Sequence, residues 1–239
     1  VTDDFICLGL FGPKSRSLMS SISKNDFSNN NFKFGTGKYI KMNDIDVWAQ
    51  RLSYVGELGF ELYVKNKHAK EIYNLIIKEE ISFKLSHCGS HAMDIMRMES
   101  GFLHWGHDIS PEENQYQAGL SFAISYKKNI NFIGKEALLK IKEQDQKKKF
   151  IHLSLKSSNP GSPLLLYDEP IYQEDKIIGR TTSGNYSFNY KKNLSFGYIK
   201  SHLSNEELTK ENLFIEVAKK KYPAIIELNP LKNKENRLS

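Results

Sequence analysis

Two scarcities narrow the class of protein at the outset. The 239 residues include only two cysteines, Cys7 and Cys88, which lie far apart and in no CxxC pair. This usage suggests a reducing compartment without a disulfide framework. No stretch approaches the roughly 18 consecutive apolar residues that a transmembrane helix needs, so we expect no membrane partner. The first residues carry neither an initiating methionine nor the segments of a signal peptide, and we expect a fragment of a longer protein.

Signatures of several common functions are absent as well. The sequence has no GxSxG elbow, no P-loop and no GxGxxG, and it has no RNP, KH or zinc-finger pattern. The net charge of +6 comes largely from lysines that are scattered in short runs near expected turns and strand ends. We therefore expect no nucleic-acid partner, although a positive field would attract a polyanionic small molecule.

The histidines do not complete a metal site. His87 and His91 stand four residues apart, so a helix would place them on one face, with Cys88 between them in sequence. No further carboxylate or thiolate stands at zinc-like spacing, and His104 and His107 form no better set. The sequence therefore predicts no metal ligands.

Hydrophobic periodicity predicts an α+β fold for the first part of the chain. The expected strands lie at 5–10, within 38–52 around an Asn43-Asp44 turn, and from 60 onward, and the expected helices lie at 15–23, 67–80 and 90–100. Leu120 to Tyr126 is expected as a strand, and a short helix opens at 132–139. This order of elements indicates a sheet with helices packed on one face.

The second part of the chain has the pattern of a small all-β domain. Short expected strands, divided by Gly, Pro, Asn and Asp, cover 150–156, 164–172, 176–179, 194–200, 213–217 and 222–228. Such spacing is typical of a barrel or sandwich, and the segment Gly179 to Gly184 is expected as a hairpin turn. The charged run 143–149 marks the boundary, so we predict domains at 1–145 and 146–239.

One stretch joins apolar strands to a charged tip. Leu52 to Val64 is expected to contain a strand end, a tight turn bounded by Gly56 and Gly59, and a second strand from Phe60. The turn carries Glu57, which is either a solvated hairpin residue or a binding group. A buried carboxylate there could accept paired N–H donors from a flat heterocycle.

Aromatic and basic side chains elsewhere in the sequence could complete such a site. Tyr54, Phe102 and Trp105 could stack on a ring or wall it. Arg97, on the expected 90–100 helix, could pair with a ligand carboxylate, or it could form an ion pair with an acidic neighbour on its own helix. The residue types alone leave both roles of Arg97 open.

Several blocks, matched in order, carry a resemblance to a known family. They are Gly12-Pro13-Lys14, Ser53 to Tyr63, Arg97-Met98-Glu99, Trp105 to Ile109, Ala118-Gly119-Leu120, Asn131 to Lys135, Thr182 to Ser187 and Lys221 to Leu231. With these blocks the sequence resembles the glycine-cleavage T-protein (aminomethyltransferase) family over nearly its whole length. Within that family it is similar to the C-terminal, folate-binding part of dimethylglycine and sarcosine dehydrogenases.

The resemblance implies a fold and an enzymatic function. The expected fold is α+β, with a T-protein-like folate-binding lobe at 1–145, incomplete at its N-terminus, followed by a small all-β barrel at 146–239. The implied activity is tetrahydrofolate-dependent one-carbon transfer from an N-methyl amine of the dimethylglycine or sarcosine type, giving 5,10-methylenetetrahydrofolate. The alternatives are an aminomethyltransferase of the glycine cleavage system, a folate-dependent demethylase of another substrate, and a non-catalytic folate-binding module.

The same resemblance implies cofactors, partners and site residues. Tetrahydrofolate would bind here, whereas FAD and the family's catalytic aspartate would lie upstream of this fragment, so no catalytic residue is expected in it. The partners would be the folate, the methylated amine and an electron-transfer partner, in a bacterial cytoplasm or a mitochondrial matrix. The implied folate-binding set is Glu57, which matches the family's pterin-contacting glutamate, with Tyr54, Phe102, Arg97 and Trp105. T-proteins have an arginine where this sequence has Met93, and that departure fits the dehydrogenase branch.

Overall fold

The computed structural model describes residues 2–128, 130–200, 204, 208 and 212–232. The chain forms two compact units. The first unit contains residues 1–100 together with 232–239, and the second contains residues 101–231. The predicted domain boundary at residue 145 stays a prediction.

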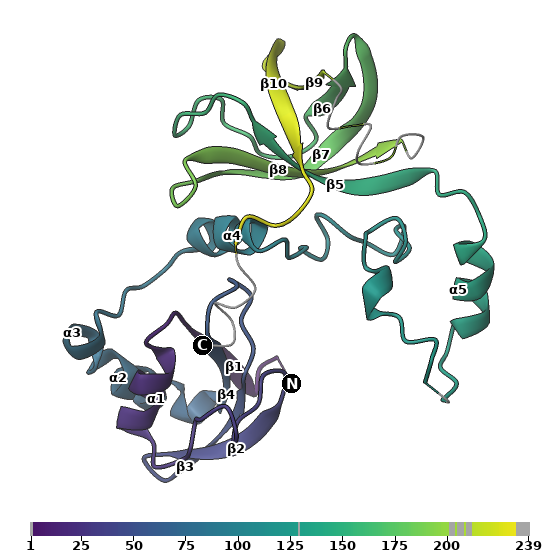
Figure 1. Ribbon diagram of the computed structural model, residues 1–239. Helices are drawn as coiled ribbons and strands as arrows, with labels where there is room; N and C mark the ends of the chain where they lie inside the picture. The colour runs from purple at the N-terminus through teal and green to yellow at the C-terminus, as the bar shows by residue number, and fades with distance from the viewer. Residues whose placement is uncertain (1, 129, 201–203, 205–207, 209–211, 233–239) are drawn as a thin grey trace. The chain divides into compact units, whose positions relative to one another are not determined.

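The first unit is built on a four-stranded antiparallel sheet with the order β1-β4-β3-β2 (Figure 1). Its strands are β1 (Phe5–Phe11), β2 (Gly37–Met42), β3 (Ile45–Gln50) and β4 (Gly59–Lys65). Asn43 and Asp44 join β2 to β3 with φ values of 47° and 62°, the left-handed conformation that a two-residue hairpin turn requires. The expected turn at Asn43-Asp44 is therefore confirmed.

Two helices pack on one face of this sheet: α1 (Ser15–Ile22) and α2 (Ala69–Ile77), which follows the short 3₁₀ turn η1 (Asn66–His68). The helices α3 (Glu80–Phe83) and α4 (Ser90–Glu99) follow α2 in the chain. Leu18 and Met19 of α1 and Ile72 of α2 are buried in one cluster with the apolar side chains of β2, β3 and β4. The α+β prediction for this part of the chain is confirmed.

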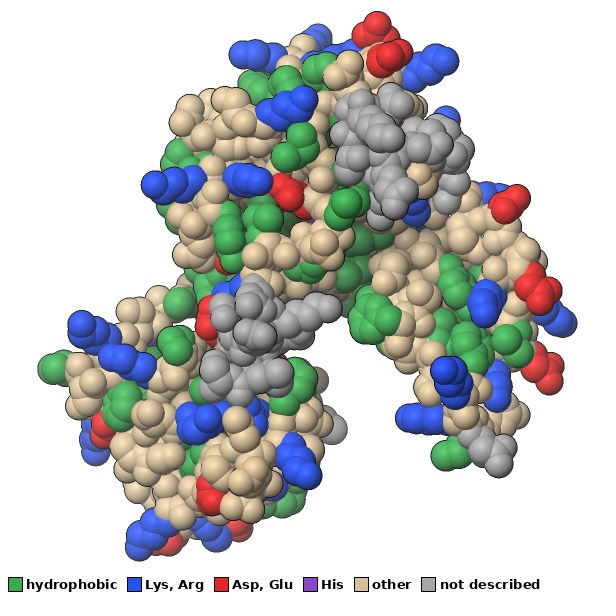
Figure 2. Space-filling view, viewed as in Figure 1, with side chains coloured by type: hydrophobic (Ala, Val, Ile, Leu, Met, Phe, Trp, Pro, Cys, Tyr) green, Lys and Arg blue, Asp and Glu red, His purple; other side chains and the backbone are tan. Residues whose placement is uncertain are grey.

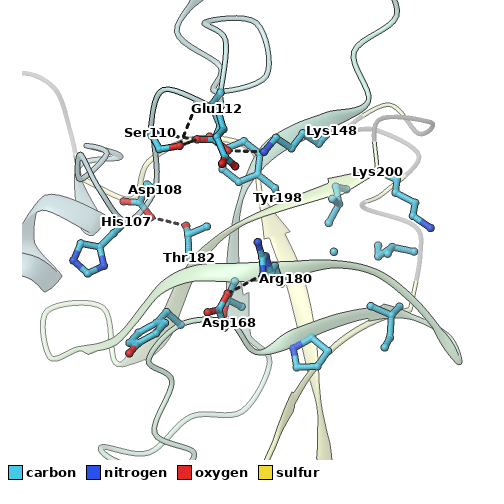
Figure 3. Close-up of a pocket in the computed structure, with 18 of the residues that line it drawn as sticks. His107, Asp108, Ser110, Glu112, Lys148, Asp168, Arg180, Thr182, Tyr198 and Lys200 are labelled. Carbon is cyan, nitrogen blue, oxygen red and sulfur yellow. Dashed lines mark hydrogen bonds and ion pairs between the residues drawn. The ribbon is translucent and has the colours of Figure 1, made fainter.

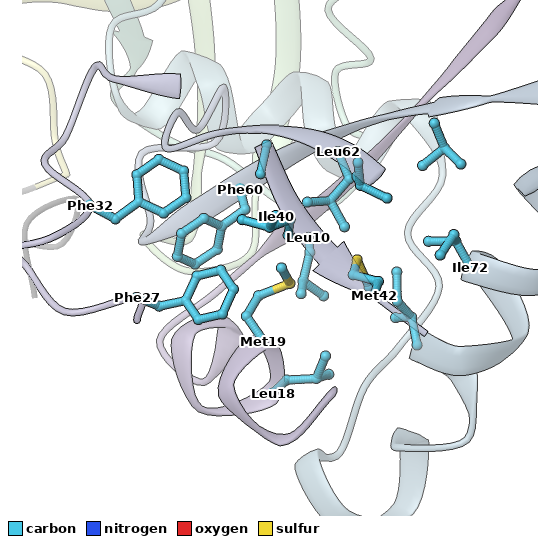
Figure 4. Packing of buried hydrophobic residues seen from close by; sticks show 14 residues of the cluster. Leu10, Leu18, Met19, Phe27, Phe32, Ile40, Met42, Phe60, Leu62 and Ile72 are labelled. Carbon is cyan, nitrogen blue, oxygen red and sulfur yellow. The ribbon is translucent and has the colours of Figure 1, made fainter. Parts of the chain in front are cut away.

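The core of the first unit contains a group of three phenylalanines (Figure 4). The ring of Phe27 lies 5.5 Å from that of Phe60 in an edge-to-face arrangement, and Phe32 lies 5.6 Å from Phe60. Phe60, Leu62 and Val64 alternate along β4 and are fully buried, because every second residue of a strand points to the same face. This buried face fixes the register of β4, since a one-residue slip would expose all three side chains.

Two local expectations for this region and the next are wrong. Strand β3 ends at Gln50 and β4 begins at Gly59, so residues 51–58 form a loop in place of the expected tight turn. The chain leaves the ladder at Arg51, whose N–H donates to the carbonyl of Thr36. Residues 120–126 form no strand: the positive φ of Gly119 leads into a 3₁₀ turn, η2 (Ser121–Ala123), held by local i→i+3 hydrogen bonds.

The second unit is a closed antiparallel barrel with the strand order β10-β5-β8-β7-β6-β9 (Figure 1). The strands are β5 (Lys148–Leu155), β6 (Pro170–Gln173), β7 (Lys176–Ser187), β8 (Lys192–Lys200), β9 (Leu213–Val217) and β10 (Lys220–Glu227). Its interior is filled by apolar side chains from all six strands, including Ile151, Ile171, Ile178, Ile199 and Ile215. The prediction of a small all-β barrel is confirmed.

The expected hairpin turn at Gly179 to Gly184 is also wrong. Both glycines lie inside β7, which pairs with β8 from Gly179 to Ser187 and has a bulge between Thr181 and Ser183. A Cβ atom at Gly179 would overlap the carbonyl oxygen of Tyr198 on the neighbouring strand. The glycine therefore serves close strand approach, which a sequence pattern cannot distinguish from a turn.

Segment 120–142 carries exposed hydrophobic side chains near α5 (Lys135–Lys142), where green and blue side chains alternate in Figure 2. Ile130 and Ile133 are largely exposed, and α5 itself buries no residue. Lysine and arginine side chains are spread over the visible face rather than gathered in one patch. Among the helices of the described residues, none combines the length and hydropathy that a membrane crossing needs.

Candidate functional site

The loop 51–58 is held at its carbonyl groups by residues from three distant segments. The carbonyl of Leu58 accepts hydrogen bonds from the N–H of Gly12 at 2.8 Å and from the hydroxyl of Ser15 at 3.3 Å. The carbonyl of Val55 accepts one from the hydroxyl of Ser100 at 3.4 Å and one from the ammonium of Lys232 at 3.1 Å. The loop is therefore anchored at two of its carbonyl groups, although it has no regular secondary structure.

Gly56 has to be a glycine in this loop. Its φ is +68°, a region that other residues enter at a cost. A Cβ atom at Gly56 would also overlap the side chain of Ser100, which follows directly on α4. The backbone at Gly56 therefore lies directly against Ser100, one residue before Glu57.

Glu57 forms an ion pair with Lys232. The Nζ atom of Lys232 lies 2.5 Å from Oε1 of Glu57, and the two side chains are 6% and 22% exposed. The N–H of Lys232 also donates to the carbonyl of Glu99 at 2.8 Å, which fixes the lysine to the end of α4. One carboxylate oxygen of Glu57 is thus fixed by a buried cation, while Oε2 accepts no hydrogen bond from a described residue.

Sequence reasoning missed Lys232 as a partner of Glu57. The two residues are 175 positions apart and belong to the same compact unit only because the chain returns to it after the barrel. A single lysine in a polar tail forms no recognisable pattern, so no sequence signal would have found it.

Arg97 is buried and paired within its own helix. Its side chain is 1% exposed, its Nε donates to Oδ1 of Asp94 at 2.9 Å, and its Nη2 lies 2.8 Å from the same oxygen. Of the two roles left open by the sequence, the ion pair inside the helix is therefore present. A contact between Arg97 and folate stays a prediction.

The remaining predicted residues are divided between the units. Tyr54 is half-buried in the 51–58 loop, and Tyr54, Glu57 and Arg97 all belong to the first unit. Phe102, half-buried, and Trp105, 65% exposed, belong to the second unit. Their role beside a bound ring stays a prediction.

The first unit also contains a cavity of about 370 Å³ next to the loop. It is lined by β1, α2, the 85–88 segment and α4, and it meets the loop at Val55, while Glu57 lies outside its lining. Met93 lines it at the position where T-proteins have an arginine, so the wall is apolar there. Cys7 lines it too, and partial burial, with the nearby Glu61 carboxylate, raises the pKa of its thiol, so Cys7 is not an activated nucleophile.

In the second unit, a buried aspartate joins two of the sequence blocks. Asp108 is 1% exposed and accepts hydrogen bonds from the hydroxyls of Thr182 at 2.5 Å and Ser183 at 2.8 Å (Figure 3). It also accepts the N–H of His104 at 2.9 Å, which closes the Trp105 to Ile109 loop. The hydroxyl-rich segment of β7 therefore holds this loop through hydrogen bonds to Asp108.

The second unit also contains a histidine, His152, whose pKa is shifted. His152 of β5 stacks on the ring of Phe196 at 4.5 Å, and burial lowers the pKa of the imidazole to about 4, although Asp108 and Glu227 act in the opposite direction. The described residues contain no cluster of three or more His, Cys, Asp or Glu side chains placed to hold a metal ion.

The fold and the glutamate loop together define a class of protein: an α+β unit with an antiparallel sheet and a Gly-Glu-Leu-Gly loop held at the end of a helix, followed in the chain by a closed barrel. Residues 1–128 match the family described as the GCVT N-terminal domain, and residues 148–231 match the glycine cleavage T-protein C-terminal barrel domain. The chain therefore belongs to the glycine cleavage T-protein family, and the resemblance found in the sequence is confirmed.

Individual relatives agree with this assignment. The chain is 33% identical over 231 residues to mitochondrial dimethylglycine dehydrogenase of Homo sapiens. The aligned region covers 97% of this chain and 26% of that protein. It is 37% identical over 179 residues to 4-methylaminobutanoate oxidase (formaldehyde-forming) of Paenarthrobacter nicotinovorans, and this alignment covers 75% of this chain and 21% of that protein. The chain thus spans about a quarter of the length of these relatives.

The solved structures support the fold independently. The crystal structure of glycine cleavage system aminomethyltransferase T from Bartonella henselae matches 98% of this chain and 60% of that chain, with a TM-score of 0.81 and 20% sequence identity. At this identity the likeness concerns the fold alone.

Proposed function

We propose that this chain binds tetrahydrofolate and forms the one-carbon transfer part of a flavin-dependent dehydrogenase. The donor would be an N-methyl amine of the dimethylglycine or sarcosine type, and the product 5,10-methylenetetrahydrofolate. The match to dimethylglycine dehydrogenase along 97% of the chain supports the choice of this branch. The activity of the whole protein belongs to the proposal, since the chain spans 26% of that relative.

The observation that carries the proposal is the fixed Glu57 carboxylate. A pterin ring presents adjacent N–H donors on one edge, and a carboxylate is the group that accepts such a pair. Lys232 holds Oε1 in place at 2.5 Å, and the 22% exposure of Glu57 leaves the carboxylate reachable. Because its position is set before a ligand arrives, binding would cost little additional ordering. The residues present therefore fit a pterin.

Within such a site the residues of this chain would position and shield the ligand. Glu57 would fix the edge of the ring and Tyr54 would pack beside it, with Phe102 and Trp105 as further walls and Arg97 as a support of α4. Tetrahydrofolate supplies the N5 nitrogen that accepts the one-carbon unit. The contribution of the chain would be mainly proximity, because holding two reactants in register converts a bimolecular step into an effectively unimolecular one.

The proposal also includes the partners that the family relationship suggests. The flavin and the aspartate that assists the transfer would be supplied by another part of a longer protein, since this sequence has no GxGxxG fingerprint. An electron-transfer partner would serve that part. The compartment would be a bacterial cytoplasm or a mitochondrial matrix.

Calorimetric titration with tetrahydrofolate tests the proposal. We expect the wild-type chain to bind it and the Glu57→Gln variant to bind it at least about tenfold more weakly, because one charge-assisted hydrogen bond is worth about 1.5–3 kcal/mol. Glu71→Gln, at an exposed position on α2, is the matched control and should bind like the wild type.

A second ligand makes the test specific for the pterin. p-Aminobenzoylglutamate contains the remainder of folate without the ring, so its affinity should be the same for the wild type and Glu57→Gln. Equal loss of both ligands in Glu57→Gln would indicate general damage to the first unit and would count against the assigned role of Glu57.

A further inference from the structure

The second unit has its own cavity. It measures about 980 Å³ and is lined by β7, β8, the start of β5 and the 106–113 and 167–170 segments (Figure 3). Arg180 lies near its middle, with Asp168 below it and Tyr198 above it in this view. None of the five residues of the folate-binding set lines this cavity.

Tyr198 places an unsatisfied hydroxyl in this cavity. The residue is 8% exposed, and its hydroxyl has no hydrogen-bond partner among the described residues. Burial raises its pKa, and so do the nearby charges of Glu113 and Asp108, so the group is a neutral donor at any physiological pH. Native structures rarely leave a buried donor unpaired, and such a group indicates a missing acceptor.

The register of the barrel gathers cations around this hydroxyl. Arg180 of β7 is the direct cross-strand partner of Tyr198 on β8, so both side chains leave the sheet on the same face. Lys200 lies two residues after Tyr198 on β8, so its side chain leaves the sheet on the same face as that of Tyr198. Lys148 of β5 is the direct cross-strand partner of Lys200 and lies on this face too. Like charges directly opposite each other are unfavourable unless a counter-charge lies between them.

Most acidic side chains of the cavity are already engaged. The buried Asp108 is saturated by Thr182, Ser183 and the N–H of His104. Glu113 forms an ion pair with Lys148, whose Nζ lies 2.5 Å from Oε1 of Glu113. Its other oxygen, Oε2, accepts hydrogen bonds from the N–H and the hydroxyl of Ser110.

The other charged pairs are weak. Oδ1 of Asp168 and Nη1 of Arg180 are 3.5 Å apart. The two side chains are 63% and 74% exposed, so solvent largely screens their attraction. Lys200 forms no ion pair with a described residue, and Glu112 is exposed to solvent. Among the described residues of this cavity, Arg180 and Lys200 are therefore the cations available to an incoming anion.

We propose that this cavity is a second binding site, which takes a small molecule through an oxyanion group, a carboxylate or a phosphate. One oxygen accepts the hydrogen bond of the Tyr198 hydroxyl, and Arg180 and Lys200 supply the positive charge. The guanidinium of Arg180 exchanges the exposed Asp168 for the ligand, a substitution that favours the ligand because its oxyanion is also hydrogen-bonded to Tyr198. The site is independent of the folate proposal, since its residues all lie in the barrel unit.

Calorimetry with two probes, inorganic phosphate and succinate, tests this site in a chloride buffer of low ionic strength. At least one probe should bind the wild-type chain, and the probe that binds identifies the oxyanion as a phosphate or a carboxylate. Tyr198→Phe, which removes only the hydroxyl, should weaken that binding about tenfold, whereas Tyr186→Phe, on the neighbouring strand and outside the cavity, should leave it unchanged.

Thermal melting of the same variants separates a ligand role from a structural one. A hydroxyl without a partner in the free chain stabilises nothing, so Tyr198→Phe should melt at the wild-type temperature or above it. Arg180→Gln should also weaken binding, with Lys176→Gln on the same strand as its control. The proposal is overturned if neither probe binds the wild type, if Tyr198→Phe binds as tightly as the wild type, or if Tyr198→Phe melts lower.

Discussion

Replacing Lys232 by methionine is the sharpest test of how the glutamate loop is held. Methionine keeps most of the side-chain length and apolar stem but removes the ammonium, which leaves the Glu57 carboxylate without its counter-charge and the Val55 carbonyl without one of its donors. Removing one partner of a buried ion pair costs about 3–5 kcal/mol. Because Glu57 is 22% exposed, water can replace part of the lost interaction, so we expect a loss at the lower end, about 3 kcal/mol.

Urea unfolding of the first unit measures this loss. Trp48 lies in the first unit and Trp105 in the second, so a Trp105→Phe background lets the fluorescence of Trp48 report on the first unit alone. Lys70→Met, at an exposed position on α2, is the matched control and should stay within about 0.5 kcal/mol of the parent.

A double-mutant cycle then isolates the ion pair. Adding Glu57→Gln to Lys232→Met removes the uncompensated charge, so the double variant should be more stable than the sum of the two single losses implies, with a coupling of about 1–3 kcal/mol. A loss of less than about 1 kcal/mol in Lys232→Met, or a coupling indistinguishable from zero, would refute the view that this pair holds the loop.

Three further predictions concern single residues. In the same urea assay, Gly56→Ala should lower the free energy of unfolding by at least about 2 kcal/mol, because the new Cβ atom overlaps the side chain of Ser100 and the backbone is strained at positive φ. Gly35 also has a positive φ but open space around it, so Gly35→Ala should cost only about 1 kcal/mol. The free energy of unfolding of the barrel should fall by up to about 3 kcal/mol as pH falls from 6.5 to 4, because the pKa of His152 is about 6.5 in the unfolded chain but about 4 in the folded one. This contribution is fully present above pH 6.5. The dependence of the free energy of unfolding on pH should be weaker in His152→Gln. Asp108→Ala should destabilise the barrel by about 3 kcal/mol, seen in Trp105 fluorescence, since one buried and two part-buried donors lose their acceptor. A change below about 1 kcal/mol would contradict the role of Asp108 in holding the loop.

The sequence predicts the regular elements well where local patterns are strong. The Asn43-Asp44 hairpin and the alternation of Phe60, Leu62 and Val64 follow from local chemistry and appear as expected. The errors fall where one pattern permits two structures. Gly179 serves strand packing rather than a turn, and residues 120–126, although largely apolar, pair with no strand among the described residues.

The candidate site was predictable only in its local part. Glu57 and its glycines stand in one short stretch, and the option of an ion pair for Arg97 follows from its helical spacing to Asp94. Lys232 and the acceptor role of Asp108 depend on contacts 175 and about 75 residues away, which no single sequence displays without an alignment. Long-range pairing is therefore the information that the structure adds.

The affinity of the Glu57→Gln variant for tetrahydrofolate, relative to that of the wild-type chain, tests the central claim most directly. The account predicts a dissociation constant at least about tenfold higher for the variant, with the first unit still folded by the Trp48 signal and the Glu71→Gln control unchanged. Wild-type affinity in a folded Glu57→Gln variant would contradict the claim that this carboxylate binds the pterin.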